Sequence, residues 1–87
     1  MRMIYCNVNP FDRYNRLYIL DEQQQIQALG KTELSTLGKL IFAECIEQDI
    51  SNVHLYGIMD YLEPVINDLQ KQQINEYGKI KIQVEVN

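Results

Sequence analysis

The sequence predicts a single α/β domain spanning residues 1–87, with the element order βββαβαβ and a five-stranded mixed sheet. The clearest observation is in residues 79–86, where charged or amide side chains alternate with aliphatic ones, as in a strand with one buried face. Two longer segments repeat apolar residues at three- and four-residue spacing, which is typical of amphipathic helices. The remaining apolar runs are short and lie between turn residues, so they predict further strands.

The first three strands are predicted as an antiparallel meander. Residues 3–8 are apolar at almost every position, which fits a central strand covered on both faces better than an edge strand. A turn around Pro10 leads to a second strand over residues 16–20. Residues 21–23 then close a hairpin to a third strand over residues 24–29, which Gly30 ends and whose glutamines favour an edge position.

The first helix is predicted to run from a cap at Thr32 or Ser35 to about Asp49. Gly38 lies inside it and is expected to allow a close approach of the helix to the sheet. The apolar stripe of this helix predicts a set of core residues: Leu34, Leu37, Leu40, Ile41, Cys45 and Ile46.

A fourth strand over residues 53–56 precedes the second helix. Asp60 and Glu63 have capping-box spacing, and Pro64 is placed in the first turn. Gly78 is expected to end this helix with a left-handed residue. Its predicted core residues are Leu62, Val65, Ile66, Leu69, Ile74 and Tyr77.

Right-handed crossovers in the C-terminal half give the strand order 3-2-1-4-5 and place two helices on one face. The opposite face of the sheet is then left without cover. The pleat predicts that the Lys and Gln positions of the last strand point to this face. By the same pattern, a polar and aromatic patch is expected there: Tyr5, Asn7, Tyr18, His54 and Tyr56.

Composition excludes several classes of function. The net charge is −4 and the eight basic residues are scattered, which argues against a protein that binds nucleic acid through its phosphates. Cys6 and Cys45 are expected to be buried and reduced, as in a cytoplasmic protein. His54 stands without the partners of a zinc site, so no metal or cofactor is expected. No run approaches about 18 apolar residues, so no membrane association is expected.

This element order resembles the ribonuclease H-like core over most of the chain, without a diagnostic motif. The resemblance implies acidic residues on the first strand and near the end of the fourth that hold two divalent metals. Asn7 and Asn9 stand where a carboxylate would be needed, and Glu44 and Asp60 are the acids roughly in place. Because two-metal chemistry needs several convergent carboxylates, we expect no catalytic residues and no enzyme activity. A degenerate or metal-dependent nuclease-like enzyme is the alternative.

The opening residues 4–12 are similar to the start of small uncharacterised proteins of bacteriophages that infect Gram-positive hosts. This similarity implies no activity. It is consistent with a phage-encoded protein, and we expect such a protein to act on a host protein. The helices carry an acidic strip that includes Glu44 and Glu47, which fits a basic, nucleic-acid-binding partner.

The sequence therefore predicts a non-enzymatic protein-interaction protein that forms a homodimer. The expected partner-binding residues are those of the acidic strip together with Tyr5, Tyr18, His54 and Tyr56 on the open face. Pairing of the last strand with a second copy is a competing mode of dimerisation. A single-stranded nucleic-acid-binding module that stacks bases on the tyrosines is a further alternative, opposed by the acidic charge.

Overall fold

The computed structural model describes residues 1–76 and 79–87, and it confirms the predicted order of elements. A short 3-10 turn, Leu34–Thr36, precedes the first helix. The strands and α-helices of the described residues are β1 Met3–Val8, β2 Asn15–Leu20, β3 Ile26–Thr32, α1 Leu37–Gln48, β4 Asn52–Gly57, α2 Met59–Glu76 and β5 Lys81–Val86.

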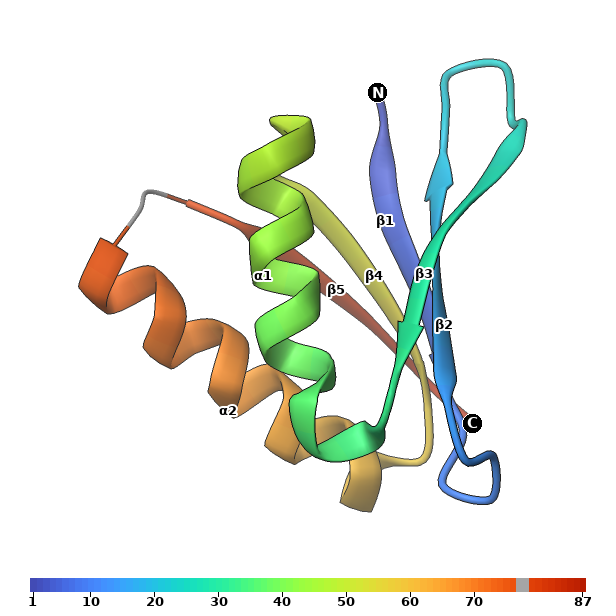
Figure 1. Ribbon diagram of the computed structural model, residues 1–87, viewed down its shortest axis with the longest axis vertical. Coiled ribbons are helices and arrows are strands. Elements are labelled where there is room, and N and C mark those ends of the chain that lie inside the picture. The colour runs from blue at the N-terminus through green and yellow to red at the C-terminus, as the bar shows by residue number, and fades with distance from the viewer. Residues whose placement is uncertain (77–78) are drawn as a thin grey trace.

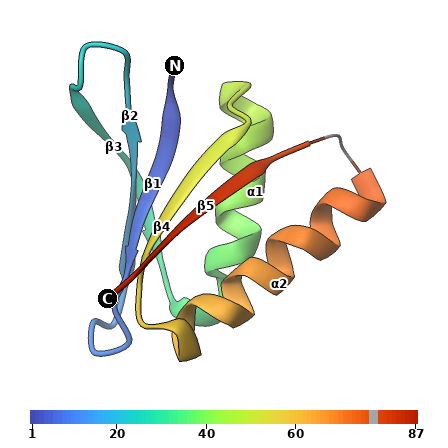
Figure 2. The ribbon, with the colours of Figure 1, turned by 180° about the vertical axis from the view of Figure 1, so that it is seen from behind.

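The sheet has the predicted order β3-β2-β1-β4-β5. The pairs β1–β2 and β2–β3 are antiparallel, whereas β1–β4 and β4–β5 are parallel. Both helices lie on one side of the sheet, as the two opposite views in Figures 1 and 2 show. β1 is therefore central, but only one of its faces is covered, and the expectation that both would be covered is wrong.

The core lies between the helices and one face of the sheet. Alternate residues of the three central strands point into it, because successive side chains of a strand face opposite sides. Burial of each large aliphatic side chain contributes about 1.5–3 kcal/mol. The fully or almost fully buried apolar residues of the described chain are Ile4, Cys6, Val8, Leu17, Ile19, Leu37, Ile41, Phe42, Cys45, Ile50, Val53, Leu55, Leu62, Val65, Leu69 and Ile80.

β3 begins later than predicted and continues past Gly30. The Asp21 carboxylate accepts hydrogen bonds from the amides of Gln23 and Gln25, at 2.9 and 2.8 Å, and Gln24 has a φ of 63°. These contacts hold residues 21–25 in the turn, so the strand starts at Ile26. Gly30 does not end it, since it pairs with Leu17 beside a shift in the register of β2 with β3, at which Leu29 is skipped.

Both helix starts differ from the prediction. Neither Thr32 nor Ser35 caps α1, because a 3-10 turn intervenes and Thr36 takes the N-cap position, with its hydroxyl donating to the Glu33 carbonyl at 3.2 Å. At α2, the Ile58 carbonyl accepts the amides of Tyr61 and Leu62, both at 3.0 Å. The helix thus begins at Met59, which places Asp60 inside the first turn and Pro64 beyond it.

Gly38 packs against the other helix and not against the sheet, which corrects the prediction. A Cβ at this position would lie 2.6 Å from the Asp68 Cβ and 3.2 Å from the Val65 carbonyl oxygen. Glycine therefore permits the close contact of α1 with α2.

The C-terminal end of α1 is stabilised by Arg2. Its guanidinium donates to the Gln48 carbonyl at 2.6 Å, which places a cation at a helix C-terminus.

Two predicted core positions are wrong. Ile46 is 46% exposed and Ile74 is 84% exposed, while Phe42 is buried in α1 without having been predicted. Tyr77 and Gly78, predicted to end α2, lie outside the described residues.

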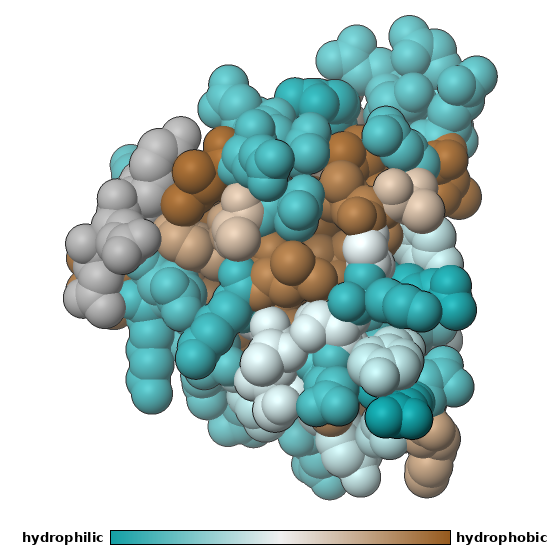
Figure 3. Space-filling model, viewed as in Figure 1, coloured by the Kyte–Doolittle hydropathy of each residue, from teal (hydrophilic) through white to brown (hydrophobic). Residues whose placement is uncertain are grey.

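In the orientation of Figure 1, hydrophilic residues cover the β2–β3 turn and apolar residues reach the surface across the middle (Figure 3). None of the described helices combines the length and the apolar character needed to cross a membrane.

Candidate functional site: the open face of the sheet

The face of the sheet turned away from the helices, here called the open face, carries three rows of side chains that run across the five strands. The middle row contains two tyrosines side by side, because Tyr5 pairs with Tyr18 on one side and with His54 on the other. Ala28 and Gln83 complete it at the two edges. All three rings are partly exposed, so the predicted placement of these residues on one uncovered face is confirmed.

Two rings of the middle row contact each other. Tyr5 and His54 pack edge to face, with ring centroids 5.3 Å apart and an interplanar angle of 75°. His54 Nε2 lies 3.5 Å from Glu85 Oε1, and it is shielded from solvent without a hydrogen-bond partner in the described part of the chain. Burial, followed by the neighbouring Glu85 carboxylate, raises the pKa of the Tyr5 phenol. Tyr5 is therefore a neutral side chain at physiological pH, with its ring fixed by its neighbours.

In the row at the amino end of β1, the side chains contributed by β1, β2 and β3 are apolar. Met3 pairs with Leu20, and Leu20 pairs with Ile26, which is 70% exposed. A hollow of about 510 Å³ opens here between two tyrosines and two aliphatic residues: Tyr5, Tyr18, Leu20 and Ile26. An uncovered hollow with this lining favours an apolar occupant.

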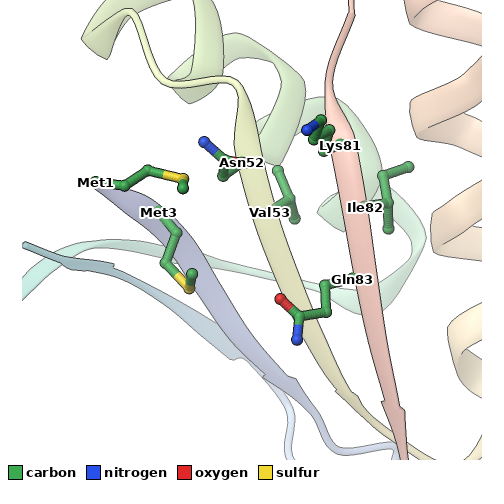
Figure 4. A pocket seen from close by; sticks show the side chains of 7 residues that line it. All are labelled: Met1, Met3, Asn52, Val53, Lys81, Ile82 and Gln83. Carbon is green, nitrogen blue, oxygen red and sulfur yellow. The ribbon is translucent and has the colours of Figure 1, made fainter.

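A second hollow, of about 460 Å³, lies on the β5 side of the same row. Figure 4 shows that its lining comes from three neighbouring strands, with the methionines on the β1 side and the longer polar side chains on β5. The lining residues are Met1, Met3, Asn52, Val53, Lys81, Ile82 and Gln83. The open face is therefore indented at this end rather than flat.

The row at the carboxyl end of β1 is polar and carries charges of opposite sign at its two edges. Asn7 pairs with Tyr56, and Tyr56 pairs with Glu85 on β5. Towards the opposite edge, Arg16 pairs with Lys31 on β3. The side chains of both basic residues line one shallow hollow on this face.

The corner beside Lys31 also gathers further basic charge. The Arg13 guanidinium and the Lys31 ammonium lie 5.2 and 5.4 Å from the centre of the Tyr14 ring. Tyr14 and Arg16 line a common hollow. Contrary to the sequence-based expectation of scattered basic residues, three of them meet at this corner.

The loop between β1 and β2 is fixed by amide side chains and presents an exposed ring. Asn15 is almost fully buried, and its Oδ1 accepts the Asn9 amide at 2.7 Å. Asn9 Oδ1 in turn accepts the Phe11 amide at 3.0 Å, and Asn9 Nδ2 donates to Asp12 at 3.1 Å. Phe11 itself is 87% exposed, and it was not among the predicted site residues.

The acidic site residues lie on the other side of the molecule. Glu47 is exposed on α1, and Glu44 is half-buried, with its Oε2 accepting from Gln48 Nε2 at 3.5 Å. Because α1 belongs to the helix layer, the fold separates these carboxylates from the tyrosines of the open face (Figure 1). The predicted partner-binding residues therefore form two surfaces and not one.

The acids considered for metal chemistry are likewise not gathered around β1. Asp60 is exposed in the first turn of α2, and Asn7 is exposed on the open face. Within residues 1–76 and 79–87, no group of three or more His, Cys, Asp or Glu side chains is arranged to hold a metal ion. Cys6 and Cys45 are free and buried, and burial raises the pKa of each thiol to about 12. At neutral pH both are protonated, so neither is activated as a nucleophile.

No protein-family model matches the chain, and no curated protein matches it. The residues of the candidate site that sequence reasoning did not single out are Arg16, Lys31 and Phe11. The alternation Arg16, Tyr18, Leu20 already indicates that these three side chains share one face, whereas the position of Lys31 depends on the register shift in β2.

Proposed function

We propose that this chain is a non-enzymatic protein-interaction domain that self-associates through the open face. The observation that carries the proposal is the row of partly buried rings, Tyr5, Tyr18 and His54. Beside this row lie an apolar hollow and a second hollow of mixed character, and neither is covered by the helices that the structure describes. A domain of this length buries only about 60–65% of the surface of its unfolded chain, so further burial is a substantial gain in stability. Exposed apolar patches on small domains commonly mark interfaces.

A second copy of the chain is the occupant that the surface fits best. The open face combines an end that is apolar over β1, β2 and β3, an aromatic middle and a polar end. The polar end carries opposite charges at its two edges, so the acidic edge of one copy is complementary to the basic edge of another. Closed twofold dimers are the commonest oligomers, and their interfaces bury the same patch from both subunits. Self-association also needs no additional partner chemistry.

Light scattering on the purified chain tests this proposal. We expect the mass of a dimer at micromolar concentrations, and a shift to the monomer in Tyr18→Glu and Tyr56→Glu, since each places a charge in the interface. Tyr61→Glu is the matched control, because Tyr61 is exposed on α2 in the helix layer. A strictly monomeric mass of the wild-type protein at high micromolar concentration contradicts the proposal.

Edge pairing of β5 is the competing mode of dimerisation, and it has its own test. The amides of Lys81 and Asn87 donate inward, to Ser51 and Gly57 at 2.8 Å each. Since inward and outward amides alternate along a strand, the Ile82 N–H points to the free edge. Ile82→Pro should then dissociate an edge-paired dimer, whereas a dimer through the open face should keep its mass.

We further propose that the chain has no nuclease activity. Asn7 and Asn9 offer no negative charge where the ribonuclease H-like resemblance requires it, and Mg²⁺ is normally held by carboxylates. Incubation with DNA, RNA and hybrid substrates in Mg²⁺ or Mn²⁺ should leave them intact. Cleavage that is lost in Asp60→Asn or Glu44→Gln would show that an enzyme is present.

Binding of single-stranded nucleic acid is a second candidate function, favoured by one observation. Arg13 and Lys31 flank the Tyr14 ring, and Arg16 lies beside them, which combines cationic groups with a surface for base stacking. Fluorescence anisotropy with a labelled oligonucleotide tests it. Affinity that falls with salt and disappears in Arg16→Glu supports this function, and absence of binding at low salt excludes it.

The acidic strip with Glu44 and Glu47 is the surface that we propose for a host partner, in line with the phage-like opening residues. A basic, nucleic-acid-binding protein has the complementary charge. This surface remains accessible in a dimer through the open face, because it belongs to the helix layer. Charge reversal at Glu44 and Glu47 should therefore leave the mass of the dimer unchanged.

A further inference from the structure

We infer that two copies pack through the open face with the twofold axis parallel to β1, so that Glu85 of one copy meets Arg16 and Lys31 of the other. This inference rests on the proposed function and adds the orientation and the charged contacts of the dimer. It depends on the positions of opposite charges on one face.

Glu85 and the two basic residues lie at the same end of the sheet but near opposite edges. Glu85 is in the last part of β5, beside Tyr56 of β4. Arg16 and Lys31 face each other on β2 and β3. The central strand β1 separates the two groups, because the sheet order is β3-β2-β1-β4-β5.

A twofold axis parallel to β1 reverses the order of the strands across the interface. Each of the three rows of side chains then lies over the same row of the other copy. β5 of one copy then covers β3 and β2 of the other, which brings Glu85 over the hollow lined by Arg16 and Lys31. Tyr5 lies in the middle row of the central strand, so it packs near its own copy at the axis. Symmetry forms the charged contact twice.

A twofold axis perpendicular to the strands is the other face-to-face arrangement, and it fits less well. It keeps the order of the strands but places the polar row of one copy on the apolar row of the other. Arg16 would then cover Leu20, and Lys31 would cover the exposed Ile26. Glu85 would meet Lys81, but Arg16 and Lys31 would both lose water without gaining an acidic partner. The axis parallel to β1 leaves one basic group in that position, Lys81, which lies opposite Ile26 of the other copy, and such desolvation is costly.

The charged contacts determine orientation more than they determine affinity. Each copy carries a net charge of −4, so two copies repel one another overall. Two local pairs of opposite charge oppose that repulsion in one orientation and exclude orientations in which like charges meet. The apolar and aromatic rows supply the buried area in either case.

A charge-swap experiment tests the orientation. Glu85→Arg and Arg16→Glu are prepared separately, and each is expected to dimerise about tenfold or more weakly than the wild-type protein, because like charges meet twice in each homodimer. When the two variants are mixed, both contacts are restored at once. Native mass spectrometry with one variant isotopically labelled should then show the mixed dimer as the main species.

Two control mixtures separate the contact from the overall charge. Glu85→Arg is mixed with Lys39→Glu, which has the same net charge as Arg16→Glu but alters an exposed residue of α1. It is also mixed with Lys81→Glu, which would restore a contact only if the axis were perpendicular to the strands. Recovery of the mixed dimer with Arg16→Glu alone supports the inference.

The outcomes distinguish the inference from the proposed function. A monomeric wild-type protein overturns both. A wild-type dimer that Tyr18→Glu dissociates, but that shows equal recovery in all three mixtures or recovery only with Lys81→Glu, overturns the orientation and leaves self-association through the open face intact. Circular dichroism of each variant shows whether a loss of dimer reflects unfolding.

Discussion

Gly57, the last residue of β4, packs too closely against β1 to carry a side chain. A Cβ there would lie 2.6 Å from the Val8 carbonyl oxygen, which is backbone and cannot rotate away. The two residues are partners in the parallel pairing of β1 and β4. Gly57 is thus required by the contact between the two strands and by its φ of 158°, a backbone conformation that residues with a side chain rarely adopt.

We expect Gly57→Ala to lower the free energy of unfolding by at least about 1–3 kcal/mol, the usual cost of overpacking, because the positive φ at this position adds backbone strain. Gly30→Ala is the matched control, since no atom lies within 4 Å of a Cβ at that position in β3. Urea denaturation of both variants gives the comparison. Equal free energies of unfolding for the two variants would show that β1 and β4 can move apart to accept the new side chain without loss of stability.

The two buried thiols predict a loss of stability at alkaline pH. Burial raises the pKa of Cys6 and Cys45 to about 12, whereas a thiol in an unfolded chain has a pKa of about 8.5. The folded protein therefore keeps both protons where the unfolded chain releases them. This contribution is complete below about pH 8.5 and is lost as the pH rises towards 12, by up to about 1.4 kcal/mol per pH unit and thiol.

Urea unfolding from about pH 8 to about pH 11 measures this decline in the free energy of unfolding. The control is the variant Cys6→Ala/Cys45→Ala, which lacks both thiols but keeps burial and Glu85, the two largest causes of the raised pKa of Tyr5. Its stability should be lower at pH 8 and should fall less steeply. Parallel curves for the two proteins would contradict the prediction.

At the scale of elements, periodicity predicts which elements form and in what order, but not where they begin. The alternation in residues 79–86 and the helical spacing around Ile41 and Leu69 each depend on local pattern, and both elements form. The ends depend on single hydrogen bonds. Hydrogen bonds to the Asp21 carboxylate keep residues 21–25 in the turn, so β3 begins at Ile26. Hydrogen bonds to the Ile58 carbonyl let α2 begin before Asp60. Such contacts compete within a fraction of a kcal/mol, which composition does not resolve.

The contact between α1 and α2 could not be predicted from a glycine in a helix alone. Gly38 was expected to face the sheet, because the spacing of apolar residues gives the direction of the buried stripe but not the neighbour that covers each position. In the fold it touches Asp68 and Val65 of α2. The side of a helix that meets another helix depends on the tertiary arrangement.

We expect Gly38→Ala to destabilise the protein, although alanine in a helix is normally favoured over glycine by about 1 kcal/mol. The new Cβ would lie 2.6 Å from the Asp68 Cβ. Asp68→Gly removes that atom, so the double variant should recover part of the loss caused by Gly38→Ala. Thermal denaturation of the single and double variants measures this coupling, and additive effects would indicate that the helices do not touch at this point.

For the whole molecule, the open face could be predicted and its charge pattern could not. The pleat assigns Tyr5, Tyr18 and His54 to one face as soon as the core residues are known. The meeting of Arg16 with Lys31 requires the register of β2 with β3, which contains a shift that no sequence pattern indicates. The cluster around Tyr14 requires the path of the loop before β2 as well.

If the open face is buried between two copies, the stability of the fold must depend on the concentration of the chain. Association stabilises the folded state by mass action, so each tenfold rise in concentration above the dissociation constant adds up to about 1.4 kcal/mol per mole of dimer. The midpoint temperature of thermal unfolding should therefore rise when the protein concentration is raised from micromolar to millimolar. Tyr18→Glu should show a midpoint that does not change with concentration, while Tyr61→Glu should follow the wild-type protein. A midpoint independent of concentration in the wild-type protein would mean that its apolar hollows stay open to water, and the self-association argued from them would not exist.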